Sequence, residues 1–307
     1  MIRHIAQGWR DISVSHKFTN QSNNGYIVPV EYLLKPKSIG IVGVSTKKGS
    51  AGLRVLNYLK NFQYEGNVHI VSRSQDDIEG ISCLKSIDEL PKGIDTVVLC
   101  VPQSAVVESV EACARRDAKS VMVFAAGFAE AGDEGILAQQ KLREIYHETG
   151  VFVGGPNCMG LTNFVSPVPL TFAPGLKMPP VSAPGLGILT QSGGMMSSIR
   201  ETSQARGIPL TYAISTGKEV VVGVEDYLDY LIEDQNTKSI AMYVEHIRRP
   251  QLFLSLAKKA RKENKPIILL HPGKSNASRE AAQSHTGSLA GDYTVIETLL
   301  KLRVCYW

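Results

Sequence analysis

Residues 39–62 read IGIVGVSTKKGSAGLRVLNYLKNF and decide the fold class. Ile39–Val44 is a short apolar run that predicts a buried strand, and Gly52–Phe62 has the pattern of an amphipathic helix. The turn between them is rich in glycine, which allows the backbone to turn sharply from a strand into a helix. This succession predicts one unit of a parallel α/β sheet.

The same alternation of short apolar runs and amphipathic stretches continues along the chain. Strands that alternate with helices require right-handed crossovers, so they predict a mostly parallel, doubly wound sheet. Further strands are expected at Val68–Val71, Thr96–Val101, Ser120–Phe124, Val151–Gly154, Leu186–Thr190, Leu210–Ser215, Ile240–Val244 and Ile267–Leu270. Helices are expected at Ala105–Arg116, Glu134–Thr149, Met195–Arg206, Val224–Glu233 and Leu252–Lys262.

A stretch rich in proline and glycine, Pro174–Gly185, interrupts this alternation and is the predicted domain boundary. We expect a Rossmann-like domain over residues 31–178 and a second α/β domain over residues 183–307. Residues 1–30 are polar with little periodicity, which predicts a flexible N-terminal extension. The last predicted helix begins near Asp292 and leaves no room for a closing strand and helix, which suggests truncation of the second domain.

The composition excludes several classes of protein. No apolar run approaches the roughly 18 residues that span a bilayer, and the N-terminus lacks the apolar core of a secretory signal, so a cytoplasmic protein without a membrane segment is expected. The five cysteines are scattered without a C-x-x-C pair, which suits reduced thiols and gives no metal site. The net charge of +4 comes without a dense basic stripe, so nucleic acid is not an expected partner.

The turn after the first strand is a candidate phosphate site, because ligands of an open parallel sheet bind beyond the carboxyl ends of its strands. Gly43, Gly49 and Gly52 do not have the G-x-G-x-x-G spacing of a dinucleotide site. The following helix nevertheless offers free N–H groups and a positive dipole end to an anion, and Lys47 and Lys48 add positive charge. We therefore favour phosphate binding over an ordinary glycine-rich turn.

The ends of the next two strands add further candidates. Arg73, between two serines, suits a ribose phosphate, either the 3′-phosphate of coenzyme A or the 2′-phosphate of NADP. Pro102 ends the third strand, and Gln103 or Ser104 is expected to cap the following helix rather than to contact a ligand. Arg73 at this position disfavours NAD as the ligand, but it does not distinguish coenzyme A from NADP.

A rigid turn is predicted after the fifth strand of the first domain. The sequence Gly155-Pro156-Asn157-Cys158 combines glycine, proline and asparagine, and it is expected to aim the polar side chain of Asn157 into the crevice. Cys158 could be a nucleophile, but no catalytic histidine lies in a supporting motif, so we expect a packed thiol.

Two segments of the second domain point to phosphoryl chemistry. Ser192, Gly193 and Gly194 end a strand and open a helix, which again predicts an anion-binding helix N-terminus. His285 is surrounded by small residues, so its imidazole could approach a phosphate and leave again. A phosphohistidine also needs a carboxylate or carbonyl on its other ring nitrogen, and Glu245, at the end of a predicted strand, is the best candidate.

Taken together, these segments resemble the succinyl-CoA synthetase superfamily, and in particular the alpha-subunit-like part of the NDP-forming acyl-CoA synthetases. The resemblance extends from about Val30 to Asp292. Residues 284–291, SHTGSLAG, resemble the phosphohistidine loop of the family; residues 155–160, GPNCMG, resemble its G-P-N-C-x-G turn; and residues 191–194, QSGG, resemble the phosphate-binding helix start.

The resemblance implies a CoA-binding domain followed by a flavodoxin-like domain, and an acid–CoA ligase reaction in three steps. ATP or GTP, with Mg, would phosphorylate His285; the phosphoryl group would pass to a small carboxylic acid; and coenzyme A would attack the acyl phosphate, with Glu245 supporting the histidine. The implied CoA contacts are Gly43, Ser45, Lys47, Gly49, Gly52, Arg73, Val101, Pro102, Gln103 and Asn157. The implied phosphate contacts are Ser192, Gly193, Gly194, Thr286 and Gly287.

The chain contains no ATP-grasp region, which the family uses to bind the nucleotide. The resemblance therefore implies a β-type ATP-grasp subunit as a partner, or a fused domain outside this chain, and we expect an oligomer. The sequence departs from the family at Ser72-Arg73-Ser74, where Asn-Pro-Lys is common, and at Lys218 and Val220, where Asn and Ala are usual.

Two other functions remain as alternatives. A non-catalytic, CoA-binding regulatory module would use the same domains, although the presence of His285 and Glu245 argues against it. An NADP-dependent reductase would explain Arg73, but it does not explain the second domain, its histidine loop or the glycine spacing.

Overall fold

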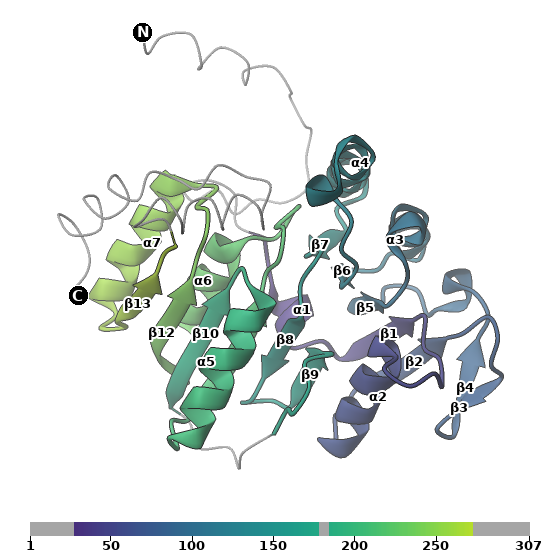
Figure 1. Cartoon of the computed structure of the whole chain (residues 1–307), viewed down its shortest axis with the longest axis horizontal. Coiled ribbons are helices and arrows are strands. Elements are labelled where there is room, and N and C mark those ends of the chain that lie inside the picture. Colours follow the sequence, from purple (N-terminus) through teal and green to yellow (C-terminus); the bar gives the residue numbers. More distant parts are fainter. Residues whose placement is uncertain (1–27, 178–183, 273–307) are drawn as a thin grey trace, which may run out of the picture.

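The computed structural model describes residues 28–177 and 184–272, which form two α/β units (Figure 1). The first predicted strand and helix form as β1 (Ser38–Val42) and α2 (Ala51–Asn61). β1 is buried along most of its length, as its continuous apolar run predicts, and α2 buries Val55, Leu56 and Leu59 on one face.

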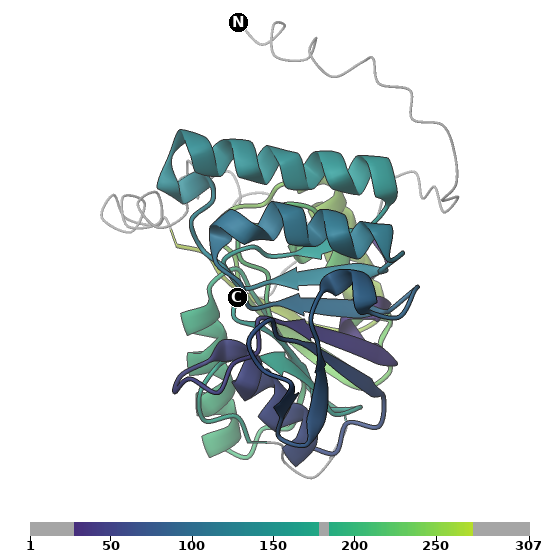
Figure 2. The same ribbon diagram turned by 90° about the vertical axis from the view of Figure 1, so that its right-hand side faces the viewer.

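The first sheet has the strand order β3-β4-β2-β1-β5-β6-β7. From β4 to β7 all neighbours are parallel, which confirms the prediction of a mostly parallel, doubly wound sheet. Its helices α3 and α4 lie together on one face, opposite α2 (Figures 1 and 2). The further elements are β2 (Asn67–Val71), β3 (Asp77–Ile78), β4 (Ile81–Leu84), β5 (Thr96–Leu99), α3 (Val106–Arg115), β6 (Ser120–Val123), α4 (Asp133–Thr149) and β7 (Phe152–Gly154), with α1 (Glu31–Leu34) before β1.

The second sheet has the strand order β13-β12-β10-β11-β8-β9. The four strands from β13 to β11 are parallel to one another, whereas β8 and β9 form an antiparallel hairpin at the edge. The elements are β8 (Gly160–Asn163), β9 (Val168–Thr171), β10 (Gly185–Thr190), α5 (Gly193–Ala205), β11 (Leu210–Ser215), α6 (Val224–Glu233), β12 (Thr237–Tyr243), α7 (Pro250–Lys262) and β13 (Ile267–Leu270).

The hairpin β8–β9 connects the two units, and the sequence pattern did not reveal it. Its residues lie before the predicted boundary at Pro174–Gly185, yet β8 pairs with β11 of the second sheet, with Asn163 opposite Tyr212. The segment after β9 is also held by the first unit, because the Tyr58 hydroxyl of α2 donates to Ala173 O at 2.8 Å. The hairpin covers the edge of β11, which would otherwise present unpaired backbone groups.

The end of the predicted N-terminal extension is part of the core. Val28 and Val30, which were expected to be flexible, are buried, and Val28 N donates to the Asp226 carboxylate at 2.9 Å. Residues 1–27 lie outside the described residues. So does the C-terminal segment from which a truncation of the second domain was predicted. Among the helices of the described residues, none is both long enough and apolar enough to cross a membrane.

Candidate functional site

The turn after β1 passes close to the end of β5. Gly43 has a φ of +85°, a region that favours glycine, and its N–H donates to Val71 O at the end of β2 at 3.1 Å. A Cβ at Gly43 would lie 2.5 Å from the backbone oxygen of Cys100. Glycine at this position therefore allows the ends of β1, β2 and β5 to meet at one edge of the sheet, where ligands of such sheets bind.

The rest of this turn places positive charge in front of α2. Lys47 and Lys48 are exposed, and the Ser50 hydroxyl caps α2 by accepting a backbone hydrogen bond from its first turn at 3.3 Å. Gly52 packs against Val44, since a Cβ there would lie 3.1 Å from Val44 Cα. A helix start, two ammonium groups and exposed backbone form a set that fits the phosphates of coenzyme A.

The other residues expected to contact coenzyme A lie around this turn with different exposure. Arg73, directly after β2, is exposed, so its guanidinium group can reach an anionic ligand. Gly49 and Pro102 are also exposed, whereas Ser45 and Val101 are half-buried.

The prediction that Gln103 or Ser104 caps the following helix is wrong. A single 3₁₀ turn, Gln103–Ala105, separates β5 from α3, and Ala105 N donates to Pro102 O at 3.0 Å. The residue before α3 is therefore Ala105, which has no side-chain acceptor to offer. The side chain of Gln103 lies instead beside Gly127, at the end of β6, where a Cβ would be 3.4 Å from Gln103 Cβ.

Asn157 lies at the same edge of the sheet but is held by a carboxylate that the sequence did not single out. Its Nδ2 donates to Glu130 Oε1 at 3.0 Å, and Gly127 N donates to the same oxygen at 3.0 Å. The ammonium group of Lys218 lies 3.6 Å from Glu130 Oε2. Although burial by itself would raise it, the hydrogen bond from Gly127 and the charge of Lys218 hold the pKa of Glu130 below its ordinary value.

The turn that contains Asn157 also joins the two units. Lys218 N donates to Pro156 O at 2.9 Å, and Val220 N donates to Gly155 O at 3.0 Å. Both donors belong to the turn after β11, so the carboxyl ends of the two sheets face each other across this contact. The turn after β7 is therefore in direct contact with the turn after β11.

Cys158 is a packed thiol, as predicted. It is buried, and its Sγ donates to Val123 O at 3.4 Å. Burial raises the pKa of the thiol to about 12, so little thiolate forms near neutral pH.

The start of α5 has the geometry of an anion site. The Ser192 hydroxyl accepts a hydrogen bond from Met195 N at 3.3 Å and caps the helix, whose first two residues are Gly193 and Gly194. A Cβ at Gly193 would overlap the side chain of Met159. The N-terminus of a helix of 13 residues thus opens at the carboxyl edge of the second sheet.

Glu245 lies next to this helix start and is fixed by Gln191. The exposed fraction of Glu245 is 6%, and its backbone N–H donates to Gln191 Oε1 at 2.7 Å. Gln191 also accepts from His246 N at 2.9 Å and donates from Nε2 to His246 O at 2.7 Å. Burial and a hydrogen bond to Glu245 raise the pKa of Tyr243. The sequence indicated Glu245, but it gave no reason to assign Gln191 this positioning role.

A second buried acid, Glu219, supports the turn after β11, and no local sequence pattern indicated it. Its Oε1 accepts from the Thr216 hydroxyl at 2.7 Å and from Val224 N at 3.1 Å. Burial, together with the nearby charge of Glu225, raises the pKa of Glu219 to about 7. The carboxyl group is therefore largely protonated at mildly acidic pH.

This pKa predicts a pH-dependent effect of Glu219→Gln on stability. In the unfolded chain the carboxyl ionises near its ordinary pKa of 4.5, whereas in the folded chain it retains its proton up to about pH 7. The free energy of unfolding of the wild type should thus fall as pH rises between these values, because the unfolded state then binds fewer protons. Urea unfolding at pH 5 and pH 8 should show that Glu219→Gln gains stability relative to wild type at the higher pH. The exposed Glu108→Gln should show no such change; an equal difference between Glu219→Gln and wild type at both pH values would contradict the assignment.

The remaining predicted site residues are not all described. Gly43, Lys47, Arg73 and Asn157 lie around the edge of the first sheet, and Ser192, Gly193, Gly194 and Glu245 lie at the edge of the second. His285, Thr286 and Gly287 lie outside the described residues. Within residues 28–177 and 184–272, no group of three or more His, Cys, Asp or Glu side chains could hold a metal ion.

Comparison with known proteins identifies both units. Residues 37–163 match the family of CoA binding domains, and residues 183–303 match the family described as a succinyl-CoA ligase like flavodoxin domain. The solved structure of the dinucleotide forming acetyl-coenzyme A synthetase 1 of Ca. Korarchaeum cryptofilum, in complex with phosphate and ADP, is 27% identical. It has a TM-score of 0.80, over 89% of this chain and 57% of that one.

Curated relatives are named as enzymes that form CoA thioesters. A trans-feruloyl-CoA synthase from an unknown prokaryotic organism is 40% identical over 92% of this chain and 39% of its own length. The alpha subunit of ADP-forming acetate–CoA ligase II of Pyrococcus furiosus is 33% identical over 89% of this chain and 58% of its own length. This chain thus spans less than two thirds of either relative. The chain thus combines a CoA binding domain with a succinyl-CoA ligase like flavodoxin domain, and over 89% of its length it is similar to an ADP-forming acetate–CoA ligase subunit.

Proposed function

We propose that this chain is the CoA-binding and phosphohistidine part of an acid–CoA ligase. The observation that carries the proposal is the fixed position of Glu245 beside the N-terminus of α5, with Gln191 holding the turn. A buried carboxylate can orient an imidazole and stabilise its positive charge, while a helix N-terminus stabilises a phosphoryl group. His285 is the imidazole that we assign to this position, with Thr286 and Gly287 beside Ser192, Gly193 and Gly194 as phosphate contacts.

Coenzyme A is proposed to bind along the edge of the first sheet. The exposed Lys47 and Arg73 and the start of α2 would meet its phosphates, and the turn around Asn157 would guide its thiol end toward the second sheet. The acyl group would then be transferred where the two edges face each other. Ser45, Gly49, Val101, Pro102 and Gln103 complete the proposed contacts.

The nucleotide is proposed to bind outside this chain. A β-type ATP-grasp subunit or a fused ATP-grasp domain would bring ATP or GTP with Mg to His285, within an oligomer. We propose a cytoplasmic location, which is supported by the free Cys83, Cys100, Cys113 and Cys158 of the described residues.

A two-part experiment tests this function. The chain alone should bind desulfo-CoA and not NADPH in a calorimetric titration; preferential binding of NADPH would point to a reductase. The chain mixed with a matching ATP-grasp subunit, ATP, coenzyme A and a carboxylic acid should form acyl-CoA, detected chromatographically. Acetate, 4-hydroxybutyrate and ferulate are the first acids to screen, because they are named in the ligases that this chain resembles. Binding of desulfo-CoA without phosphoryl transfer would instead favour a regulatory module.

A further inference from the structure

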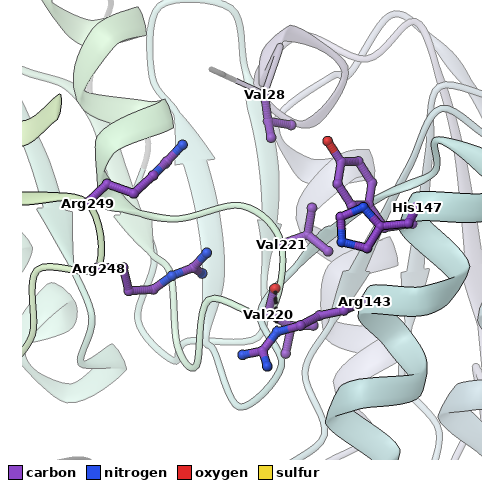
Figure 3. A pocket seen from close by; sticks show the side chains of 8 residues that line it. Val28, Arg143, His147, Val220, Val221, Arg248 and Arg249 are labelled. Atoms are coloured by element: carbon purple, nitrogen blue, oxygen red, sulfur yellow. Dashed lines mark hydrogen bonds between the residues drawn. The ribbon is translucent and has the colours of Figure 1, made fainter. Parts of the chain in front are cut away.

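A cavity of about 190 Å³ lies between α4 and the turns that follow β11 and β12 (Figure 3). Its lining side chains come from four parts of the chain that are distant in the sequence: Val28; Arg143, Tyr146 and His147 of α4; Val220 and Val221 of the turn after β11; and Arg248 and Arg249 of the turn after β12. None of these eight residues has been assigned above to the binding of coenzyme A or to phosphoryl transfer. The cavity thus borders the carboxyl edge of the second sheet, but its lining residues differ from the proposed site residues.

The polar lining of the cavity is basic. Three of the eight lining residues are arginines and one is a histidine, whereas none is acidic. Figure 3 shows Arg143 and Arg248 approaching the turn at Val220 from opposite sides. The Arg143 guanidinium group is oriented by a hydrogen bond from Nε to Val220 O at 3.3 Å.

The three arginines differ in how their charges are compensated. Arg249 binds two buried carboxylates, with Nη2 at 2.6 Å from Asp226 and 3.3 Å from Glu225. Arg248 interacts with the charge of the buried Glu219, but its buried Nη1 lacks a hydrogen-bond partner in the part of the chain that the structure describes. Burial and the nearby charge of Arg248 lower the pKa of Arg143, as expected for two cations close together in a partly desolvated site. An anion between Arg143 and Arg248 would relieve this repulsion and satisfy the buried N–H group.

The chemistry of the lining selects the kind of anion. A guanidinium group is a planar fork of donors that matches the oxygens of phosphate or carboxylate in pairs. Two such forks on one cavity favour a dianion over a monoanion, because each unit of charge on the ligand interacts with both cations. We propose that this cavity binds a phosphoryl dianion between Arg143 and Arg248, either as inorganic phosphate or as the terminal phosphate of a nucleotide.

Titration of the purified chain with inorganic phosphate, followed by calorimetry at constant ionic strength, tests the site. Arg143→Gln and Arg248→Gln should each raise the Kd for phosphate about tenfold, which is the loss expected for one charge-assisted hydrogen bond. The exposed Arg115→Gln of α3 is the matched control and should leave the Kd unchanged. Ser192→Ala and His285→Ala should also retain this binding, because they alter only the proposed phosphoryl-transfer site.

Two further measurements cover misfolding and the source of the phosphate. If either glutamine variant fails to fold, Arg143→Lys and Arg248→Lys are used instead. Lysine keeps the positive charge but lacks the planar pair of donors of a guanidinium group, so these variants should still weaken the binding of phosphate. If ADP competes with phosphate and its binding depends on Arg248, the cavity binds the terminal phosphate of a nucleotide. If ADP does not displace phosphate, the cavity binds free phosphate. Unchanged phosphate affinity in the arginine variants, loss of binding in Ser192→Ala alone, or acetate binding as tight as phosphate would each overturn the proposal.

Discussion

The His285→Ala variant is expected to lose phosphoryl incorporation from ATP completely while it continues to bind desulfo-CoA. Alanine has no nucleophilic nitrogen, so no phosphohistidine can form, and ligation must stop at its first step. The measurement is the transfer of radiolabelled phosphate to the chain in the presence of a matching ATP-grasp subunit. Acid-labile, base-stable label on the wild type and its absence from His285→Ala would establish the role.

The controls separate this role from a general loss of structure. His69→Ala, in β2, should be labelled like the wild type, because His69 lies outside the proposed site. Equal label on wild type and His285→Ala would show that another residue carries the phosphoryl group. Label on neither protein, with desulfo-CoA still bound, would favour the regulatory module instead.

The second large effect is expected for Glu245→Gln, which should slow phosphorylation of the chain by about 10²- to 10⁴-fold. A neutral amide of the same shape cannot stabilise a positively charged imidazole, and loss of an orienting carboxylate has effects of this order in related histidine–carboxylate arrangements. The turn itself should survive the substitution, because Gln191 binds the backbone N–H groups of Glu245 and His246.

Single-turnover labelling measures this effect directly. The rate of label incorporation should fall in Glu245→Gln, whereas the Kd for desulfo-CoA should stay that of the wild type. Glu263→Gln, an exposed acid at the end of α7, provides the matched control and should react at the wild-type rate. A labelling rate for Glu245→Gln within threefold of the wild type would show that Glu245 does not support the histidine.

The sequence predicted most helices and strands of both units, because their burial requires apolar residues in a pattern that is visible over a short stretch of the chain. The predicted and observed ranges coincide for α6 and β13, and the start of β12 was placed three residues late, at Ile240 instead of Thr237. The helices and strands that it missed are α1 and the short strands β3, β4, β8 and β9, which lie at or next to the edges of their sheets. These strands lack the continuous apolar run that revealed the short strand β13.

The candidate site residues were predictable where a turn after a strand contains glycines, a helix cap or an acid that suggests a role by itself. The glycine-rich turn at Gly43, the helix start at Ser192 and the acid at Glu245 all follow strands, and the structure places them at sheet edges. Glu130 and Glu219 carried no such signal. Glu130 binds Asn157, Glu219 is buried beside Glu225, and both arrangements depend on segments that only the fold brings together.

The sequence by itself determined the type and order of the α/β units, the turns at the carboxyl ends of their strands, and the resemblance to a family, because each depends on residues that are close in the chain. Only the tertiary structure decided that β8–β9 completes the second sheet and that Gln191 fixes Glu245. It also placed Arg143 and Arg248 on one cavity. Contacts between distant segments are selected by packing and by the need to satisfy buried polar groups, and neither leaves a local pattern in the sequence.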